Sequence, residues 1–304
     1  MLVTRQPVLR RFWYAVMPLD ALAAGPRPFT LLGDALLLHL TDDGRPHARH
    51  APDPDALVPD PADAAPVRCQ ARYGLVWVAL DAPLHDIFEI PEDADPGYRR
   101  VQQFDAAWRT GALRLMENSF DAAHFAFVHK GTFGQFSQQK PEFFALHETD
   151  YGFEAETRLT INNPPASHRI TGSTEPTTQR HFRNQWHLPF SRRLGMEYPN
   201  GLRHVIYTCA TPIDDGRIQL LQWLYRNDTE ADCPAAELND WDRRVIEEDK
   251  EILESVDPDA PVDVSRRDEF SMPADQPGLI MRKRLLELLR AHGEEEVHGH
   301  AARA

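Results

Sequence analysis

The chain has 304 residues, with 33 Lys and Arg against 47 Asp and Glu, which gives a net charge of −14. A surface this acidic repels phosphate backbones and anionic lipids, so neither nucleic acid nor a membrane is an expected partner. The three cysteines exclude a disulfide scaffold and a four-cysteine iron–sulfur cluster, and their odd number is typical of a reducing compartment.

Residues 1–100 are predicted to be rich in β-structure. Aromatic and β-branched runs predict strands at 12–16 and 73–80, and residues 29–40 are typical of two strands joined at Leu32-Gly33-Asp34. Residues 46–66 contain six prolines and four aspartates, which predicts an extended linker. No segment has the uninterrupted apolar run of a signal peptide or a membrane span, so we expect a cytoplasmic protein.

Residues 101–292 are expected to form a second domain. Helical content at 107–123 is followed by predicted strands at 143–147, 153–161, 168–172, 181–187, 201–210 and 217–226. Two helices are predicted to close this domain, at about 235–256 and at 277–292, and residues 293–304 are predicted to be a flexible tail. A helix, then consecutive antiparallel strands, then helices is typical of the α+β class.

Residues 117–129 combine side chains that can bind a metal with Phe, Ala and Val. Burial of such polar groups costs free energy unless they pair or bind an ion. His124 and His129 are five positions apart, and on a regular helix this offset turns them about 140° away from each other. They can share a metal only where the helix ends or distorts between them, and the glycines at 131 and 134 predict such an ending.

Two imidazoles need a carboxylate to form the facial triad that holds Fe(II) with open coordination positions. The candidate is Asp249, in an acidic stretch at 247–254 that is by itself more typical of a solvated helix face. Spacing alone leaves two interpretations of the histidine segment open, a metal site and a buried polar cluster.

The pattern Glu-Asn-x-x-Asp-x-x-His-x-x-x-x-His at 117–129 resembles the mononuclear iron motif of Rieske-type non-haem iron, aromatic ring-hydroxylating oxygenases. Glu-Asp-x-x-Ile-Leu-Glu at 248–254 is similar to the segment that provides their third iron ligand. Other parts of the chain also resemble sequences of this family, namely the segments at 12–33, 72–78, 211–214 and 278–289. The likeness therefore covers most of residues 10–292. The chain is most similar to the demethylase-like branch, which contains vanillate O-demethylase oxygenases and methylxanthine N-demethylases.

The resemblance implies a helix-grip catalytic domain of the Bet v1/START-like kind, with a substrate cavity between the sheet and the iron. It implies that His124, His129 and Asp249 bind mononuclear Fe(II). Asp121 matches the acidic residue that hydrogen-bonds a ligand histidine and links it, in a trimer, to the Rieske cluster of a neighbouring subunit. Asn118 is expected near the iron.

The cluster motif of the family, Cys-x-His followed by Cys-x-x-His, is missing from the chain. This motif binds a [2Fe–2S] cluster through two cysteines and two histidines, and no cysteine here has a histidine two or three positions later. We therefore expect residues 1–100 to be the shortened β frame of a degenerate Rieske domain without a cluster, with the linker at 46–66 in place of the cluster loops. Electrons are then expected in trans, from a partner protein with a Rieske or ferredoxin cluster and its reductase.

The resulting hypothesis is an oxygenase component in a homo- or hetero-trimer. It uses Fe(II) and O₂ to hydroxylate, or oxidatively O- or N-demethylate, a small aromatic or heterocyclic substrate. Two alternatives stay open, a non-catalytic assembly partner of a full-length Rieske oxygenase and an inactive remnant of an internal deletion. The complete ligand set favours catalysis. The strands at 153–226 are expected to line the cavity, with His187 and His204 as possible contacts, but the inward faces need a register.

Overall fold

The computed structural model describes residues 1–51, 66–137 and 139–299 of the chain. These residues form two sheets, both antiparallel between all paired strands, together with six α-helices. The predicted α+β class is therefore confirmed. No helix in the described part of the chain is long and apolar enough to span a membrane.

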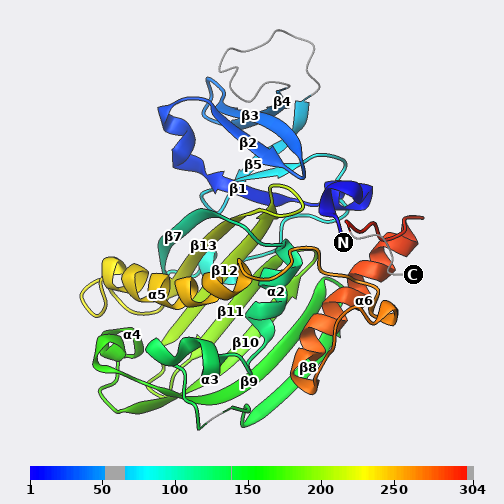
Figure 1. Cartoon of the computed structure of the whole chain (residues 1–304). Helices are drawn as coiled ribbons and strands as arrows, with labels where there is room; N and C mark the ends of the chain where they lie inside the picture. The colour runs from blue at the N-terminus through cyan, green and yellow to red at the C-terminus, as the bar shows by residue number, and fades with distance from the viewer. Residues whose placement is uncertain (52–65, 138, 300–304) are drawn as a thin grey trace.

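The first sheet has six strands in the order β1-β6-β5-β4-β3-β2 and lies above the larger sheet in Figure 1. The strands are β1 (Tyr14–Pro18), β2 (Arg27–Leu31), β3 (Asp34–Leu40), β4 (Pro46–His50), β5 (Pro66–Arg72) and β6 (Leu75–Ala79). The predicted turn at Leu32-Gly33 joins β2 to β3, with both residues at positive φ. The buried strand β6 coincides with the apolar run at 73–80.

The first part of the predicted linker at 46–66 is a strand instead. Residues Pro46–His50 form β4 and pair with β3, from Pro46 opposite Leu40 to His50 opposite Leu36. Proline is tolerated here because it is the first residue of the strand, and Ala48 packs into the core. Residues 52–65 lie outside the described part of the chain.

The second sheet has seven strands in the order β7-β13-β12-β11-β10-β9-β8. Their bounds are β7 (Arg99–Trp108), β8 (Phe143–Thr149), β9 (Gly152–Asn162), β10 (Thr177–His187), β11 (Ser191–Glu197), β12 (Arg203–Pro212) and β13 (Ile218–Arg226). Buried and exposed residues alternate along β9 and β10, as expected when the side chains of a strand point to opposite faces. The sheet therefore has two distinct faces.

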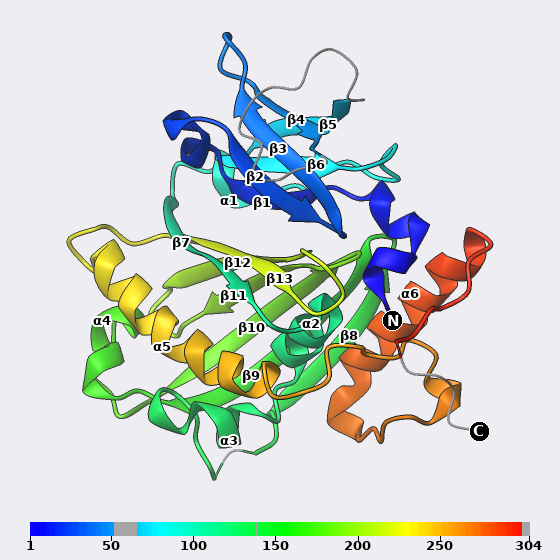
Figure 2. The same ribbon diagram turned by 45° about the horizontal axis from the view of Figure 1, so that its top comes forward.

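Helices α2 (Ala112–Phe120), α5 (Ala235–Leu253) and α6 (Gln276–Ala291) cover one face of this sheet (Figure 1, Figure 2). The other helices are four residues long and are α1 (Pro91–Ala94), α3 (Phe125–Val128) and α4 (His168–Thr171). Helix α2 contacts β12, α5 contacts β7 and α6 contacts β9. The buried side chains of α2, among them Leu113, Met116 and Phe120, are repeated at helical spacing.

The strand predicted at 168–172 is wrong, because residues His168–Thr171 form helix α4. Asn163 explains the turn that leads into it: its Oδ1 accepts hydrogen bonds from Ser167 Oγ at 2.8 Å and from Thr171 Oγ1 at 2.9 Å. Gly172, at φ 64°, ends the helix. These hydrogen bonds lie in the connection between β9 and β10, and the residue types at 168–172 do not reveal them.

Two other boundaries differ from expectation. The helix predicted at 107–123 begins only at Ala112, because β7 continues to Trp108 and pairs there with Ile218 of β13. The C-terminal segment is docked as far as residue 299, in contrast to the flexible tail expected from 293. Glu294 accepts a hydrogen bond from the Val8 amide at 2.7 Å, and Glu296 accepts one from the Val262 amide at 2.6 Å.

Candidate metal centre

The two histidines of the 117–129 segment lie on either side of a short helix. Helix α2 ends at Phe120, and the chain turns before α3 begins at Phe125, so that His124 occupies the N-cap and His129 the C-cap of α3. The helix break that a shared metal requires is therefore present. Gly134 is part of it, since its amide donates to the His129 carbonyl at 2.8 Å.

The structure brings His124, His129 and Asp249 together. His124 Nε2 is 3.1 Å from His129 Nε2 and 3.3 Å from Asp249 Oδ1, and His129 Nε2 is 3.4 Å from the same oxygen. Asp249 reaches this point from α5. The three ligand atoms form a nearly equilateral triangle of one carboxylate oxygen and two imidazole nitrogens.

This triangle fits a divalent metal. Ligands at right angles around an ion with bonds of about 2.1 Å are about 3 Å apart, close to the three distances found here. Two imidazoles and one carboxylate on one face of an ion form the donor set that non-haem Fe(II) prefers. In the described part of the chain, these three residues are the group of histidine, cysteine and acidic side chains whose ligand atoms lie close enough together to share one metal ion.

Neighbouring side chains orient the three ligands. Glu248 Oε2 lies 2.9 Å from His129 Nδ1, which therefore carries the proton and leaves Nε2 free to bind an ion. Thr132 Oγ1 donates to the same carboxylate at 2.8 Å. Asn118 Nδ2 donates to Asp249 Oδ1 at 3.1 Å, so Asn118 lies beside the triad as the resemblance implied.

Asp121 lies close to His124 without a hydrogen bond to it. Its Oδ2 is 3.8 Å from His124 Nδ1, too far for a hydrogen bond, and Nδ1 is buried without a partner. The other oxygen accepts a hydrogen bond from the Ala123 amide at 2.8 Å. Glu117, the first residue of the motif, points away from the triad and binds Arg282 of α6 in an ion pair.

The carboxylates determine the protonation of the triad in the absence of an ion. Burial opposes the charge on His124, but Asp121 and Asp249 outweigh it and raise its pKa to about 9. Burial and the neighbouring His124 lower the pKa of His129. Burial opposes the charge on Asp249, but the hydrogen bond to His124 and the two imidazole charges hold its pKa below the usual value. A positive charge in the triangle is thus already stabilised by the site.

A cavity of about 110 Å³ lies next to the triad, between the sheet and α5. Even-numbered residues of β10 to β13 face it, as the pairing of Met196 with His204 and of Thr208 with Gln222 requires. Its apolar wall includes Leu115, Phe125, Phe133, Phe182, Leu194 and Trp241. Its polar lining includes Arg180, Arg192, Tyr198, His204, Gln222 and Asp242.

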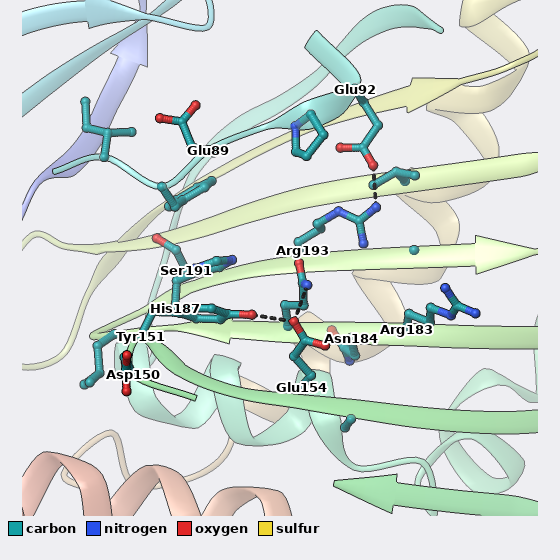
Figure 3. A pocket seen from close by; sticks show the side chains of 18 of the residues that line it. Glu89, Glu92, Asp150, Tyr151, Glu154, Arg183, Asn184, His187, Ser191 and Arg193 are labelled. Atoms are coloured by element: carbon teal, nitrogen blue, oxygen red, sulfur yellow. Dashed lines mark hydrogen bonds and ion pairs between the residues drawn. The ribbon is translucent and has the colours of Figure 1, made fainter. Parts of the chain in front are cut away.

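Of the two histidines considered as substrate contacts, only His204 lies on this face. His187 lies on the opposite face of the sheet, where it is stacked between Phe88 and Tyr151. It borders a second cavity of about 960 Å³, in which Glu92 forms an ion pair with Arg193 (Figure 3). The triad is on the other side of the sheet, so this larger cavity is not the one that adjoins the metal ligands.

Sequence reasoning missed Glu248 and the polar lining of the cavity apart from His204. Glu248 directly precedes Asp249, so the Glu-Asp pair was a usable signal for one ligand and one orienting carboxylate. Arg180 is a charged residue at a position of β10 where alternation places a buried side chain. Without the position of the strand, this signal could not be separated from an exposed arginine.

Comparison with known proteins agrees with this architecture. Residues 108–291 match the family of the vanillate O-demethylase oxygenase C-terminal domain. Over 247 residues the chain is 30% identical to methylxanthine N1-demethylase NdmA of Pseudomonas putida, covering 79% of this chain and 66% of the relative. It is 27% identical to methylxanthine N3-demethylase NdmB of the same species, covering 80% of this chain and 66% of the relative.

Solved structures show the same fold. The structure of Pseudomonas putida CBB5 NdmA superposes with a TM-score of 0.74 at 24% identity and covers 94% of this chain and 92% of that one. Dicamba monooxygenase bound to 3,6-dichlorosalicylic acid superposes with a TM-score of 0.77 at 16% identity and covers 94% and 99%. The family match extends over more than half of the chain and includes both histidines and Asp249. The chain therefore belongs to the family of the vanillate O-demethylase oxygenase C-terminal domain, which confirms its resemblance to the demethylase branch of the Rieske-type oxygenases.

Proposed function

We propose that the chain is the oxygenase component of a Rieske-type system, with mononuclear Fe(II) held by His124, His129 and Asp249. The reaction is the hydroxylation or the oxidative O- or N-demethylation of a small aromatic or heterocyclic substrate. The observation that carries this proposal is the convergence of three ligand atoms within 3.4 Å of one another at the wall of a cavity. The relatives named methylxanthine demethylases and dicamba monooxygenase support the reaction class.

The residues of the chain have separate tasks in this reaction. When bound, Fe(II) supplies the redox chemistry that activates O₂. Glu248 holds His129 in the tautomer that presents Nε2, and Asn118 orients Asp249. The apolar wall of the cavity excludes water and positions a planar ring beside the triad.

Electrons come from a separate protein in this proposal, because no cysteine of the chain has the spacing that a Rieske cluster requires. Asp121 is suited to the contact with that protein. Its side chain is 28% exposed, and its Oδ2 faces His124 Nδ1 at 3.8 Å, so it lies between the surface and the triad. A Rieske or ferredoxin cluster docked at Asp121, in a homo- or hetero-trimer, is thereby connected to a proposed iron ligand.

Anaerobic metal binding tests the proposal most directly. Chain freed of metal and titrated with Fe(II) should bind one ion per chain, and His124→Ala, His129→Ala and Asp249→Ala should each lose this stoichiometric binding. His147→Ala, on β8 outside the site, is the matched control and should bind like the unchanged chain. A chain that is folded by circular dichroism and binds no stoichiometric Fe(II) contradicts the proposal.

Activity of the reconstituted complex separates catalysis from assembly. With an iron-loaded chain, a partner cluster protein and its reductase, His124→Ala should abolish substrate oxidation. An unchanged rate for this variant in a mixed complex indicates instead that the chain contributes only an interface.

A further inference from the structure

The larger cavity, of about 960 Å³, lies on the face of the second sheet that is turned away from the triad. Trp77 of β6 in the first sheet lines one side of it, residues of β9 to β12 line the other, and Phe88 lies in the connection between the two sheets. Clefts between domains are common ligand sites, and their volumes are about 300–1,000 Å³. The proposed oxygenase reaction does not use this cavity.

Three stacked rings form one wall of this cavity. His187 lies between Phe88 and Tyr151, with 4.7 Å between ring centroids and 20° between ring planes on both sides. Burial and the neighbouring Arg193 lower the pKa of His187 to about 4, so the imidazole is uncharged at neutral pH. His187 covers one face of Tyr151, which is 37% exposed, so the edge and the other face of the tyrosine ring are open. The face of such a ring attracts cations.

Two exposed carboxylates beside Tyr151 have no positively charged partner in the described part of the chain. Glu154 accepts hydrogen bonds from two neutral donors, the Tyr151 hydroxyl at 2.5 Å and Gln185 Nε2 at 2.7 Å (Figure 3). The carboxylate of Asp150 forms neither an ion pair nor a hydrogen bond within that part of the chain. At the same wall His187 Nε2 is buried without a hydrogen-bond partner, which is unusual for a buried polar atom.

Arginines compensate the other carboxylates that line the cavity. The ion pairs join Glu92 to Arg193, Asp86 and Glu89 to Arg72, Glu156 to Arg158, and Glu197 to Arg203. Arg284 lies beside Asp150 but donates to its backbone carbonyl at 3.1 Å and not to its carboxylate. The negative charge that lacks compensation is therefore concentrated beside the open ring of Tyr151, where it favours a cation.

We propose that this cavity is a second ligand site, which binds a planar organic cation against Tyr151 through ion pairs with Asp150 and Glu154. The stacked rings recognise the flat body of the ligand, and the two carboxylates recognise its charge. An N–H group of the ligand donates to His187 Nε2 and provides the partner that this atom lacks. The site lies on the opposite face of the sheet from the triad, so the inference does not rest on the proposed function.

Calorimetric titration of the anaerobic, Fe(II)-loaded chain tests this proposal. The probes are the 1-methylnicotinamide cation and 3-methylbenzamide, which has the same shape without the charge. The cation should bind more tightly by about tenfold, as for a cation–π contact together with a partly exposed ion pair, and added salt should weaken the cation alone. The double variant Asp150→Asn/Glu154→Gln should lose the preference. Asp240→Asn/Glu175→Gln, at exposed positions outside the cavity, is the matched control and should retain it.

A further variant separates the two cavities. His124→Ala should bind the cation like the unchanged chain, because His124 borders only the smaller cavity. A loss of cation binding in this variant assigns the cation to the cavity beside the triad and overturns the proposal. Equal affinity for the two probes, or no binding of either, also overturns it, and this comparison on the unchanged chain needs no variant to fold. A preference that persists in the folded Asp150→Asn/Glu154→Gln variant excludes the two carboxylates and has the same consequence.

Discussion

At the scale of single residues, the geometry of the proposed metal triad depends on a carboxylate outside it. Glu248 shares the α5 helix with Asp249 and reaches His129 Nδ1 on the side of the ring away from the proposed ion. This contact selects the tautomer and fixes the plane of the imidazole. Asp242, about two turns before Asp249 on the same face of α5, is buried next to the cavity and has a different effect, on stability.

Glu248→Gln should weaken Fe(II) binding by about tenfold to a hundredfold, the usual loss when a carboxylate behind a metal-binding histidine is removed. The amide keeps the size of the side chain but no longer favours the correct tautomer. Competition of the chain with a chelator measures the affinity. Glu251→Gln, an exposed position on the same helix, should leave the affinity unchanged, and an equal loss in both variants contradicts the role of Glu248.

Asp242→Asn should stabilise the protein at neutral and alkaline pH. Burial raises the pKa of Asp242 to about 6, although Gln103 and two arginines favour the ionised form. The folded chain therefore binds this proton more tightly than the unfolded chain, so stability falls as the pH rises from about 4 to 6 and stays reduced above 6.

The neutral amide removes this penalty, which is about 3 kcal/mol. Urea unfolding should show a higher free energy of unfolding for Asp242→Asn at pH 8 and no difference from the unchanged chain at pH 4. Asp240→Asn, exposed on the same helix, should show no such pH-dependent gain. A gain of the same size at both pH values contradicts the assignment to ionisation.

At the scale of secondary structure, the break between α2 and α3 allows two histidines five positions apart to meet. A continuous helix would separate them by about 140°. The return of the chain after His129 is tight, because the backbone at Gly134 passes directly over α3. A Cβ added to Gly134 would lie 2.2 Å from the Phe125 carbonyl oxygen and 2.8 Å from the His129 carbonyl.

Gly134→Ala should therefore displace the segment that carries His129. We expect a loss of about 1–3 kcal/mol in the free energy of unfolding, as for other overpacked sites, together with weaker Fe(II) binding. Thermal unfolding and metal titration measure the two effects. Gly216→Ala is the control, since the nearest atoms to its added Cβ are 3.9 Å away, and it should affect neither quantity.

At the scale of the whole molecule, a complete triad is combined with a first sheet whose sequence lacks a Rieske motif. The iron-loaded chain alone should accordingly show no absorption from a [2Fe–2S] cluster and no substrate-dependent O₂ uptake with a reductase. Addition of a protein that carries such a cluster should start the uptake. Turnover by the chain and reductase without that protein contradicts electron delivery in trans.

Asp121→Asn should slow that uptake while Fe(II) binding stays intact, because Asp121 is proposed to connect the docked cluster to His124. Oxygen-electrode rates and metal titrations on the same preparations separate the two properties. Asp20→Asn, exposed in the N-terminal region, is the control for a general loss of negative charge. An unchanged rate for Asp121→Asn removes Asp121 from the proposed route.

Much of the fold could be predicted because its signals are local. The hairpin at Leu32-Gly33 and the closing helices follow from turn residues and periodicity, which act over a few positions. The helix at 168–171 could not be predicted in this way. It depends on hydrogen bonds from Ser167 and Thr171 to one asparagine, a network that the residue types alone do not reveal.

The sequence by itself determined the class of the fold, the family and the candidate ligands, because the spacing of the 117–129 motif and the Cys spacings are one-dimensional properties. Only the tertiary structure decided which strand residues face the triad. A shift of one position in register exchanges the two faces of a strand, and it was the pairing of β11 with β10 on one side and β12 on the other that placed Arg180 and His204 in the cavity. The surroundings of these side chains are likewise a property of three dimensions, because His204 meets Arg226 of β13 and Asp242 of α5 only in the folded chain.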